Sequence, residues 1–441
     1  MNQIIVRVDE FLKSYGMHYE SIDIEKEISI FIEEMNRGLK GEPSTLKMLC
    51  TYLSSEGQIP IGEPVIVIDA GGTNFRVAVV SFDKNKKPVI EDFKLHPMPG
   101  TQGQLSKEEF FKTIAGYLEP VIGKSNKIGF CFSYPTEILP NKDGKLIGFN
   151  KEVRVSGMQG QEIGANLLHA LKAIGYEADK RIVLLNDTVA TLLGGKAAYP
   201  DRRFDSYIGF ILGTGTNTCY LEGNREIVKA KLLAREQGVT MINIESGGYG
   251  KIPRGTLDQK FDSTTADPGS QQFEKMIAGA YQGRLVLEVI KKAAEDGLLS
   301  KQCTERVHAI KELITKEVND FCLYPYSDSN VLARCASSDS AEGERDRKTL
   351  YFIIDALLER AAKLVAVNLA AVMLKTGKGK NPCFPVCVTV EGTTFYKSKL
   401  FRGKLDYYVK TCLNDKLGIY SDFAKAENAT LVGTAIAGLL N

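Results

Sequence analysis

The sequence lacks the features of membrane, secreted and nucleic-acid-binding proteins. No apolar run approaches the roughly 20 residues that a bilayer-spanning helix needs. The formal net charge over 441 residues is only +2 at pH 7, so no electrostatic attraction to nucleic acid or an anionic membrane is expected. The opening residues, MNQIIVRVDEFLKSYG, carry early charges and no signal-type apolar core. We therefore expect a cytoplasmic protein without a membrane or nucleic-acid partner.

Cysteine and histidine clusters are also scarce. The nine cysteines are odd in number and scattered through apolar segments. Cys383 and Cys387 are the only close pair, and no second pair or histidine cluster completes a zinc site. We expect reduced thiols in the core rather than disulfides or structural zinc.

The remaining composition is that of a globular protein with more than one domain. Hydrophobic residues make up 44% and charged residues 25% of the chain. Because 441 residues are too many for one compact core, two or three domains are predicted. Residues 199–201, Tyr-Pro-Asp, are the best candidate for a crossing between domains.

The stretch from Val65 to Phe82, VIVIDAGGTNFRVAVVSF, predicts a β-hairpin around a Gly-Gly turn. Glycines in such a turn let a ligand approach bare N–H groups, and Asp69 at its mouth is suited to a hydrated Mg²⁺. An ordinary hairpin, with Asp69 bonded to its own turn, is the alternative. A second unit of this kind, strand–GTGTN–strand, follows at Tyr207–Leu221. Two such turns suit a two-lobed protein that grips one phosphate chain from both sides.

Other segments are predicted from periodicity and end signals. A capping box at Ser106–Glu109 begins a helix. Residues 1–56 look helical, with a stop at Gly38, Gly41 and Pro43, and residues 338–348 look like an exposed loop. Further predicted helices are Gln161–Leu171, VATLLGGKAA after Asp187, Gln271–Ala293, Thr304–Phe321, Leu350–Lys375 and Ala429–Leu440; further strands are Lys127–Phe132, Ile182–Leu185 and Pro385–Val390.

Eight segments occur in the order in which one enzyme family carries them. They are FIEEMNRGL at Phe31, IDAGGTNFRV at Ile68, FSYPTE at Phe132, LNDTVATLL at Leu185, GTGTNTCYLE at Gly213, NIESGGYG at Asn243, DPGSQQFEKMIAGAYQG at Asp267 and RAAKLVAVNLAAV at Arg360. Through them the chain resembles the hexokinase family along nearly its whole length. The resemblance implies an α/β, two-lobed, actin-like ATPase (ribonuclease H-like) fold around a central cleft. Residues 65–197 plus 429–441 would form the small domain, and residues 1–64 plus 198–428 the large one.

The chain also departs from the family pattern. Ala70 stands where the family usually has Leu, Asn150 where it has Thr, and Glu391 where it has Asp. The C-terminal segment KAENATLVGTAIAG lacks the usual Gly-Ser-Gly-Lys run of the adenosine segment. The nucleotide's base contacts are therefore less well predicted than the sugar site.

The resemblance implies a catalytic base and a sugar cage. Asp187, at a strand end before a helix, would be the base for the sugar hydroxyl; spacing alone favours an N-cap instead. Lys151 would stabilise the transferring phosphoryl group, although most lysines simply lie at the surface. For the two cage glutamates, a solvated helix face is the alternative. The cage would comprise Ser133, Asn150, Lys151, Asn186, Asp187, Asn217, Glu245, Gln271 and Glu274.

The nucleotide side would be built from the glycine turns. Asp69 would hold Mg²⁺ through water, and Arg76 either lines the phosphates or points outward from its strand. The phosphate and adenosine contacts would be Gly71, Gly72, Thr73, Asn74, Arg76, Gly213, Thr214, Gly215, Gly392 and Thr393.

The predicted function is ATP- and Mg²⁺-dependent phosphorylation of the 6-hydroxyl of glucose or a related hexose, feeding glycolysis, by a monomer or homodimer. Three alternatives stay open: a kinase of the same fold for an amino sugar or ketose, a non-catalytic sugar sensor, and an actin-like structural protein. Asp69, Lys151 and Asp187 argue against the sensor, whereas the degraded adenosine segment favours it. The sugar cage argues against a structural protein.

Overall fold

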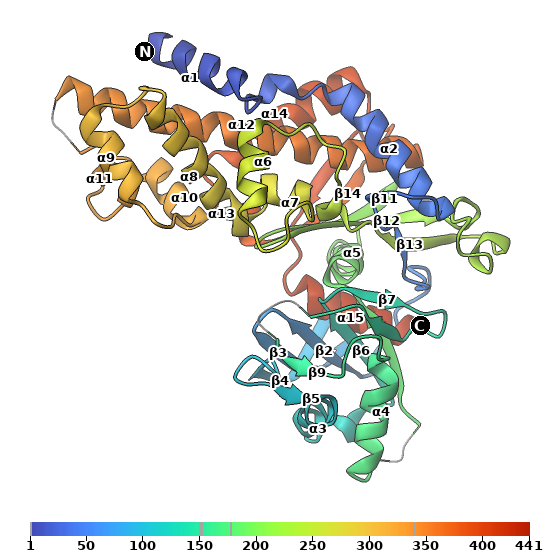
Figure 1. Cartoon of the computed structure of the whole chain (residues 1–441). Coiled ribbons are helices and arrows are strands. Elements are labelled where there is room, and N and C mark those ends of the chain that lie inside the picture. The colour runs from blue at the N-terminus through green and yellow to red at the C-terminus, as the bar shows by residue number, and fades with distance from the viewer. Residues whose placement is uncertain (1, 150–152, 177–178, 338–339) are drawn as a thin grey trace.

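The structure, a computed structural model, describes residues 2–149, 153–176, 179–337 and 340–441. Asn150 and Lys151, both predicted for the site, lie outside the described residues. The described chain forms two α/β bodies, each built on its own sheet (Figure 1). Helix α5 (Asp187–Ala198) lies between them and packs against strands of the second sheet and against the C-terminal helix α15 (Ala429–Leu440).

The first body contains a five-stranded sheet. Its order is β10 (Arg181–Leu185), β6 (Lys127–Phe132), β2 (Val65–Gly71), β3 (Asn74–Phe82) and β4 (Pro88–Pro97). Strands β2 and β3 form the predicted hairpin, with Gly71 opposite Asn74, while β6 lies parallel to β2 and to β10. Ile66 and Ile68 face one core and Val65 and Val67 the other, which explains why β2 reads as a continuous apolar run.

Helices cover both faces of this sheet. α3 (Lys107–Leu118) and α4 (Ile163–Ala173) share the core of Ile66 and Ile68, whereas α5 and α15 share that of Val65 and Val67. Ser106 begins α3 with the predicted capping box. The short strand pairs β5 (Leu105–Ser106) with β9 (Val155–Ser156), and β7 (Thr136–Ile138) with β8 (Gly144–Leu146), complete this body.

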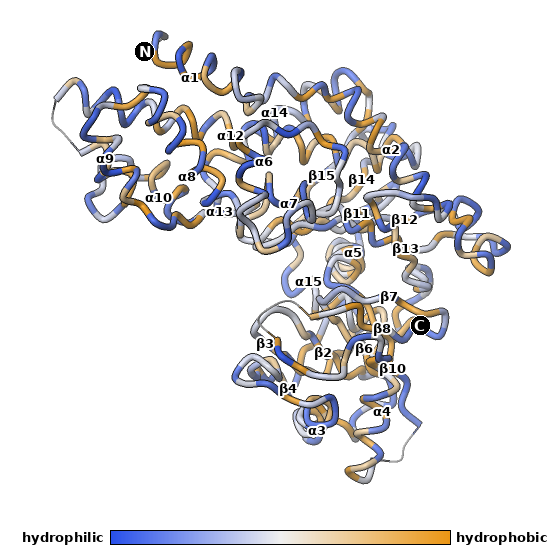
Figure 2. The backbone as a smooth tube through the Cα atoms, viewed as in Figure 1, coloured by the Kyte–Doolittle hydropathy of each residue, from blue (hydrophilic) through white to orange (hydrophobic). Residues whose placement is uncertain are grey.

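The second body contains a six-stranded sheet. Its order is β1 (Leu49–Cys50), β13 (Val239–Asn243), β12 (Thr216–Gly223), β11 (Ser206–Leu212), β14 (Val386–Glu391) and β15 (Ser421–Ala424). α2 (Ile24–Lys40) and α12 (Ala341–Thr376) share a core with this sheet. α2 buries Ile24, Ile28, Phe31, Met35 and Leu39 along one face. The alternation of hydrophilic and hydrophobic residues along α2 in Figure 2 is that of an amphipathic helix.

A helical extension packs beside the second sheet around a core of its own, which includes the first half of α12. Its helices are α1 (Asn2–Ser14), α6 (Thr256–Ser263), α8 (Gly279–Glu295), α9 (Lys301–Ala309), α10 (Thr315–Leu323) and α11 (Val331–Cys335). The short helix α7 (Gln272–Ile277) instead packs Phe273, Met276 and Ile277 into the core of the second sheet. α13 (Thr393–Lys397) and α14 (Phe401–Tyr408) follow β14, and a π-helical segment, Val409–Lys416, continues α14. Within the described part of the chain, no helix has the length and apolarity to cross a membrane.

Four predicted helical boundaries were wrong. Residues 41–56 contain only the short strand β1 and irregular backbone. The predicted helix 271–293 is broken at Ala278, because the N–H groups of Gly279 and Ala280 donate to carbonyl groups of the turn after β11. The predicted helix 304–321 is two helices separated by residues 310–314. Residues 341–348 are the start of α12 rather than a loop, with Ser340 as the N-cap.

Candidate active site

Three parallel strands end at one edge of the first sheet. Asp69 of β2 lies opposite Cys131 of β6, and Cys131 lies opposite Leu185 of β10. Ser133 and Asp187 each follow two residues later, so the register places them with Asp69 at the same edge. The carboxyl ends of parallel strands are where α/β folds bind their ligands.

Asp187 is the first residue of α5, and Asn186 is its N-cap. The Asn186 side chain accepts from the Thr188 N–H at 2.9 Å, so the capping role falls on Asn186 and leaves the Asp187 carboxylate free of it. Burial and the neighbouring Asp69 charge raise the pKa of Asp187 to about 6, against the lowering effect of hydrogen bonds from Thr188 and Ser133. Such a pKa suits a base that works near neutral pH.

Asp69 is buried and paired with Arg76, whose Nη1 donates to the Asp69 carboxylate at 2.6 Å. The Arg76 side chain, 41% exposed, therefore lies on the Asp69 side of the hairpin, and its contact with the phosphates stays a prediction. Burial raises the pKa of Asp69 and that of Glu391, and the Asp69 charge raises the pKa of Glu391 further. The Asp69 charge thus raises the pKa of both Asp187 and Glu391.

These carboxylates fit the Mg²⁺ ion that the family implies. Hard carboxylate oxygens are the ligands that Mg²⁺ takes from proteins, usually one or two of them together with waters and substrate phosphates. Burial is the larger cause of the raised pKa of Asp187 and the Asp69 charge the smaller one, and a cation beside Asp69 would offset the second of these. Among the described residues, no group of three or more His, Cys, Asp or Glu side chains is placed to hold a metal directly.

The first glycine turn lies against the loop that follows β6. Gly72 has φ +58°, and the Tyr134 hydroxyl donates to its carbonyl oxygen at 2.9 Å. A Cβ on Gly71 would lie 3.2 Å from the Ser133 Oγ, so the turn approaches the predicted sugar loop closely. Thr73 and Asn74 complete the turn, and the Thr73 carbonyl accepts from Met98 N–H.

The second turn, Gly213–Gly215, is held by helix α8. The N–H groups of Gly279 and Ala280 donate to the carbonyls of Gly213 and Thr214 at 2.8 and 3.0 Å. The Thr394 hydroxyl donates to the Gly213 carbonyl at 2.8 Å, which brings the predicted Gly392 and Thr393 beside this turn.

A cavity of about 430 Å³ opens next to this turn. Thr214 and Thr393, both predicted for the nucleotide, line it together with parts of α8, α10 and α13. The residues that line it include Gly279, Ile314, Asn319, Leu358 and Lys397, and none from the segment 425–438. Its walls are mostly apolar with a few polar groups, as in sites for nucleotide-sized ligands.

Three of the predicted cage residues lie together in the second body. The Asn217 amide donates to the Glu245 carboxylate at 3.0 Å, and Asn243 donates to it at 2.8 Å. Glu274 accepts from the Thr216 N–H at 2.9 Å. Both glutamates are half-buried and hydrogen-bonded, so neither lies on a solvated helix face.

Glu274 has the more perturbed carboxyl group of the two. Burial and the charges of Glu245 and Asp267 raise its pKa to about 7, while Thr216 and Lys275 lower it. Its neighbour in the loop, Gln271, has φ +49°, and Glu245 has φ +59°. Non-glycine residues rarely adopt this region, and where they do they often mark a functional site.

The two bodies meet beside these groups. Asn186 from the first body and Glu245 from the second line one small cavity, together with Tyr134 and Asn243. Sequence reasoning missed Asn243 and Tyr134. Asn243 stands two positions before Glu245 in the motif NIESGGYG, and a polar residue ending an otherwise apolar strand was the available signal.

Comparisons with known proteins agree with this geometry. Two family models described as hexokinase match the chain, one over residues 207–440 and the other over residues 7–197. Hexokinase-3 of Mus musculus is 29% identical over 379 residues, which cover 82% of this chain but only 40% of the mouse protein. Hexokinase-5 of Oryza sativa is 28% identical over 434 residues, covering 92% of this chain and 84% of the rice protein.

A solved structure shows the same fold. The hexokinase of Schistosoma mansoni complexed with glucose matches with a TM-score of 0.77 and 23% identity, covering 99% of each chain. The two bodies are therefore those of the predicted two-lobed, actin-like ATPase fold. Because one hexokinase family model covers more than half of this sequence and a second covers most of the rest, the chain belongs to the hexokinase family.

Proposed function

We propose that this protein transfers the γ-phosphoryl group of Mg·ATP to the 6-hydroxyl of glucose or a related hexose. The observation that carries the proposal is the Asp187 carboxyl group, with its pKa raised to about 6, at the strand edge shared with Asp69 and Ser133. A carboxylate in this position would accept the proton of the attacking hydroxyl. Mouse, rice and Schistosoma relatives named hexokinase support the same chemistry.

The other residues would bind and orient the two substrates. Glu245 and Glu274 would each accept two sugar hydroxyl protons, and Asn217, already bonded to Glu245, would fix the orientation of that carboxylate. Gly71, Gly72, Thr214 and Gly215 would present N–H groups to the phosphates, whereas the Gly213 N–H already donates to the Gly215 carbonyl at 3.0 Å and would shape the turn. The cavity beside Thr393 would take the adenosine. Mg²⁺, held near Asp69 through water, would neutralise phosphate charge when bound.

Closure of the two bodies on the sugar would complete the site. Asn186 and Glu245, which come from different bodies, already line one cavity beside the connecting segments. Closing would exclude water, which otherwise competes with the sugar as phosphoryl acceptor. Ordering the sugar first would therefore protect ATP from hydrolysis.

Replacement of Asp187 by Ala tests the proposal. We expect turnover of glucose to fall by about 10² to 10⁴, because the general base is lost, while the sugar cage still binds. Turnover is measured by coupled release of ADP from Mg·ATP with glucose, fructose, mannose or glucosamine as acceptor. Sugar binding is measured by titration calorimetry, because the chain has no tryptophan to report it by fluorescence.

The outcomes separate the alternatives. Undiminished turnover in Asp187→Ala would remove Asp187 from the chemistry. Wild-type protein that binds glucose but releases no ADP would be a non-catalytic sugar sensor, the second candidate, which the absent Gly-Ser-Gly-Lys run favours. Turnover with glucosamine or fructose in preference to glucose would indicate a related sugar kinase.

A further inference from the structure

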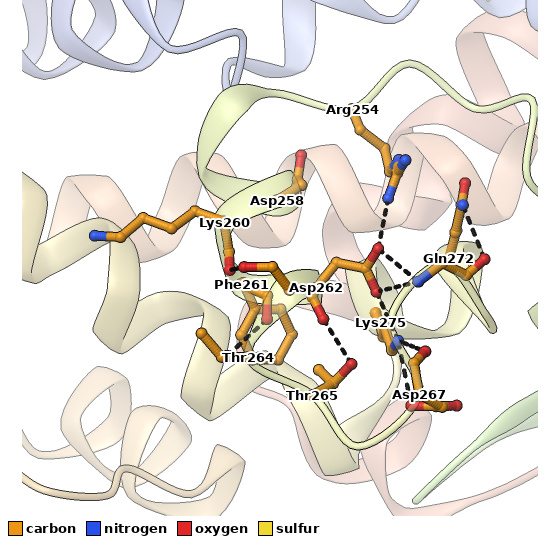
Figure 3. Close-up of polar contacts among 12 residues, drawn as sticks. Arg254, Asp258, Lys260, Phe261, Asp262, Thr264, Thr265, Asp267, Gln272 and Lys275 are labelled. Atoms are coloured by element: carbon orange, nitrogen blue, oxygen red, sulfur yellow. Dashed lines mark hydrogen bonds and ion pairs between the residues drawn. The ribbon is translucent and has the colours of Figure 1, made fainter.

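A network of charged side chains lies behind the predicted sugar glutamate Glu274. Lys275, the next residue along α7, is buried with 3% of its surface exposed. Its Nζ donates to the Asp262 carboxylate at 2.7 Å and to the Asp267 carbonyl at 2.8 Å, and it lies 3.3 Å from the Asp267 carboxylate. Figure 3 shows these side chains converging between α6 and α7.

Asp262 is the centre of this network. It projects from α6 and also accepts from Arg254 Nη1 at 3.0 Å and from the Gly269 N–H at 3.2 and 3.0 Å on its two oxygens. These donors hold the pKa of Asp262 below its usual value despite its burial. Both carboxylate oxygens of Asp262 therefore accept hydrogen bonds, and the buried charge is fully hydrogen-bonded.

The network holds the loop between α6 and α7. Asp262 accepts from the N–H of Gly269 near the end of the loop, and Lys275 donates to the carbonyl of Asp267 in its middle. The loop ends at Gln271, whose φ of +49° must be imposed by its surroundings. α7 has only six residues, and so short a helix does not fix its own orientation.

We propose that Asp262 and Lys275 are positioning residues for sugar binding, because together they fix the loop and the first turn of α7 that present Gln271 and Glu274. The inference rests on the proposed function, since Gln271 and Glu274 matter only if they contact the sugar. Neither Asp262 nor Lys275 touches the substrate. Their effect is transmitted through the backbone of residues 267–275.

Two charged residues of the network, Asp267 and Lys275, also affect the pKa of Glu274. Asp267 and Glu245 raise the pKa of Glu274, whereas Lys275 and the hydrogen bond from Thr216 lower it; Tyr281 of α8 is the other titratable group whose pKa responds to Glu274. Removing the Lys275 charge should therefore move the titration of Glu274 to higher pH. Removing the Asp267 charge should move it to lower pH. Simple loss of stability would not produce opposite shifts.

The test compares Lys275→Met and Asp267→Asn with wild type and with Lys260→Met as the matched control. Lys260 lies on the same helix as Asp262, has a side chain 57% exposed and is ion-paired to Glu288 instead. KM for glucose, KM for ATP and kcat are measured from pH 5.5 to 8.5, and glucose dissociation constants are measured by titration calorimetry.

We expect KM and Kd for glucose to rise about tenfold or more in Lys275→Met, with KM for ATP unchanged, because small displacements of a binding group weaken contact strongly. Glucose binding should weaken at low pH as Glu274 becomes protonated. The pH at which it weakens should be higher in Lys275→Met and lower in Asp267→Asn. Lys260→Met should behave as wild type. Where Lys275→Met fails to fold, Asp262→Asn takes its place, because it removes the ion pair with Lys275 and keeps one carbonyl oxygen that can accept from the Gly269 N–H; KM and Kd for glucose should rise in it while KM for ATP stays unchanged.

Two results count against the inference. Unchanged glucose affinity in Lys275→Met, or in Asp262→Asn where Lys275→Met does not fold, overturns the positioning role, and a pH dependence of glucose binding that stays fixed in Asp267→Asn overturns the charge coupling to Glu274. Both are read from sugar binding and do not depend on turnover. Failure of the proposed function looks different, because the wild-type protein would then neither bind a hexose in the calorimeter nor release ADP.

Discussion

At the scale of single residues, the candidate site contains buried carboxyl groups whose pKa is raised because burial destabilises their charged form. Asp187 carries a pKa of about 6 in the folded protein against 3.8 for an unperturbed carboxyl group. Ionising it in the fold therefore costs free energy that the unfolded chain does not spend. Active sites commonly trade stability for function in this way.

The sign of that cost gives a prediction for Asp187→Asn. Because the folded-state pKa is raised, the protein loses stability as pH rises from about 4 to about 6, and below that window the cost is absent. The neutral amide that replaces the carboxylate has no such cost, so the variant should be more stable by about 1–3 kcal/mol at pH 7.5. Thermal unfolding at pH 7.5 and at pH 4 measures it. A gain of the same size at both values would contradict the assigned cause.

The residue scale also shows that Asp187 is not the N-cap of α5, while its role as the base stays a prediction. Sequence spacing alone favoured Asp187 as an N-cap, because the pattern Asn-Asp-Thr before a helix fits either residue in that role. The structure gives the cap to Asn186 through a 2.9 Å hydrogen bond. The N-cap is the last residue with extended backbone before the helix. Because Asn and Asp both favour that position, the sequence Asn186-Asp187 does not show which of the two occupies it.

At the scale of elements, helices α5 and α15 pack unusually closely. A Cβ on Gly433 of α15 would lie 1.8 Å from the Ala190 carbonyl oxygen of α5, and one on Gly194 would lie 2.3 Å from that of Ala429. Their small residues, which the sequence shows as VATLLGGKAA and ATLVGTAIAG, make this approach possible. α5 begins at Asp187, so the contact also orients the candidate base.

Gly433→Ala tests that packing. An added methyl group meets backbone that cannot yield, so we expect a loss of about 2–3 kcal/mol despite the better helix propensity of alanine. Gly403→Ala is the matched control, because Gly403 lies in α14 with nothing within 4 Å of a new Cβ. The control should be neutral or gain about 0.5–1 kcal/mol. Melting temperatures compare the two variants, and equal values would exclude close packing as the cause.

At the scale of the whole molecule, the predicted site draws on both bodies. Asp69, Ser133 and Asp187 come from the first sheet and its following helix, whereas Asn217, Glu245 and Glu274 come from the second body. α5 packs against both sheets (Figure 1). The proposed domain boundaries, 65–197 plus 429–441 and 1–64 plus 198–428, stay a prediction, as do the cytoplasmic location and the monomeric or homodimeric state.

Closure of the bodies on sugar gives the prediction at this scale. Saturating glucose should decrease the radius of gyration measured by small-angle X-ray scattering, because the cage residues of both bodies contact one ligand. In Asp187→Ala the two bodies should still close on glucose, since the other cage groups remain. A sugar that the protein does not bind should leave the radius of gyration unchanged. An unchanged radius with bound glucose would show that the site is already assembled without closure.

Local patterns along the chain were enough to predict the strand–glycine turn–strand units, the capping box of α3, the strand β6 and the small-residue helix α15. These depend on contacts between residues that are near in sequence, such as apolar runs bounded by turn residues or a serine three positions before a glutamate. The ordered family segments likewise predicted the fold, because they preserve spacing along the chain.

Contacts between distant segments of the chain determine where the helices break and which groups share the site. The break at Ala278 exists because the N–H groups of Gly279 and Ala280 bond to a turn more than sixty residues earlier in the chain. The pairing of Arg76 with Asp69, the support of Glu245 by Asn243 and the buried network around Lys275 depend on the same kind of contact. Such contacts form between segments distant in sequence, and no local pattern encodes which segments the fold will bring together.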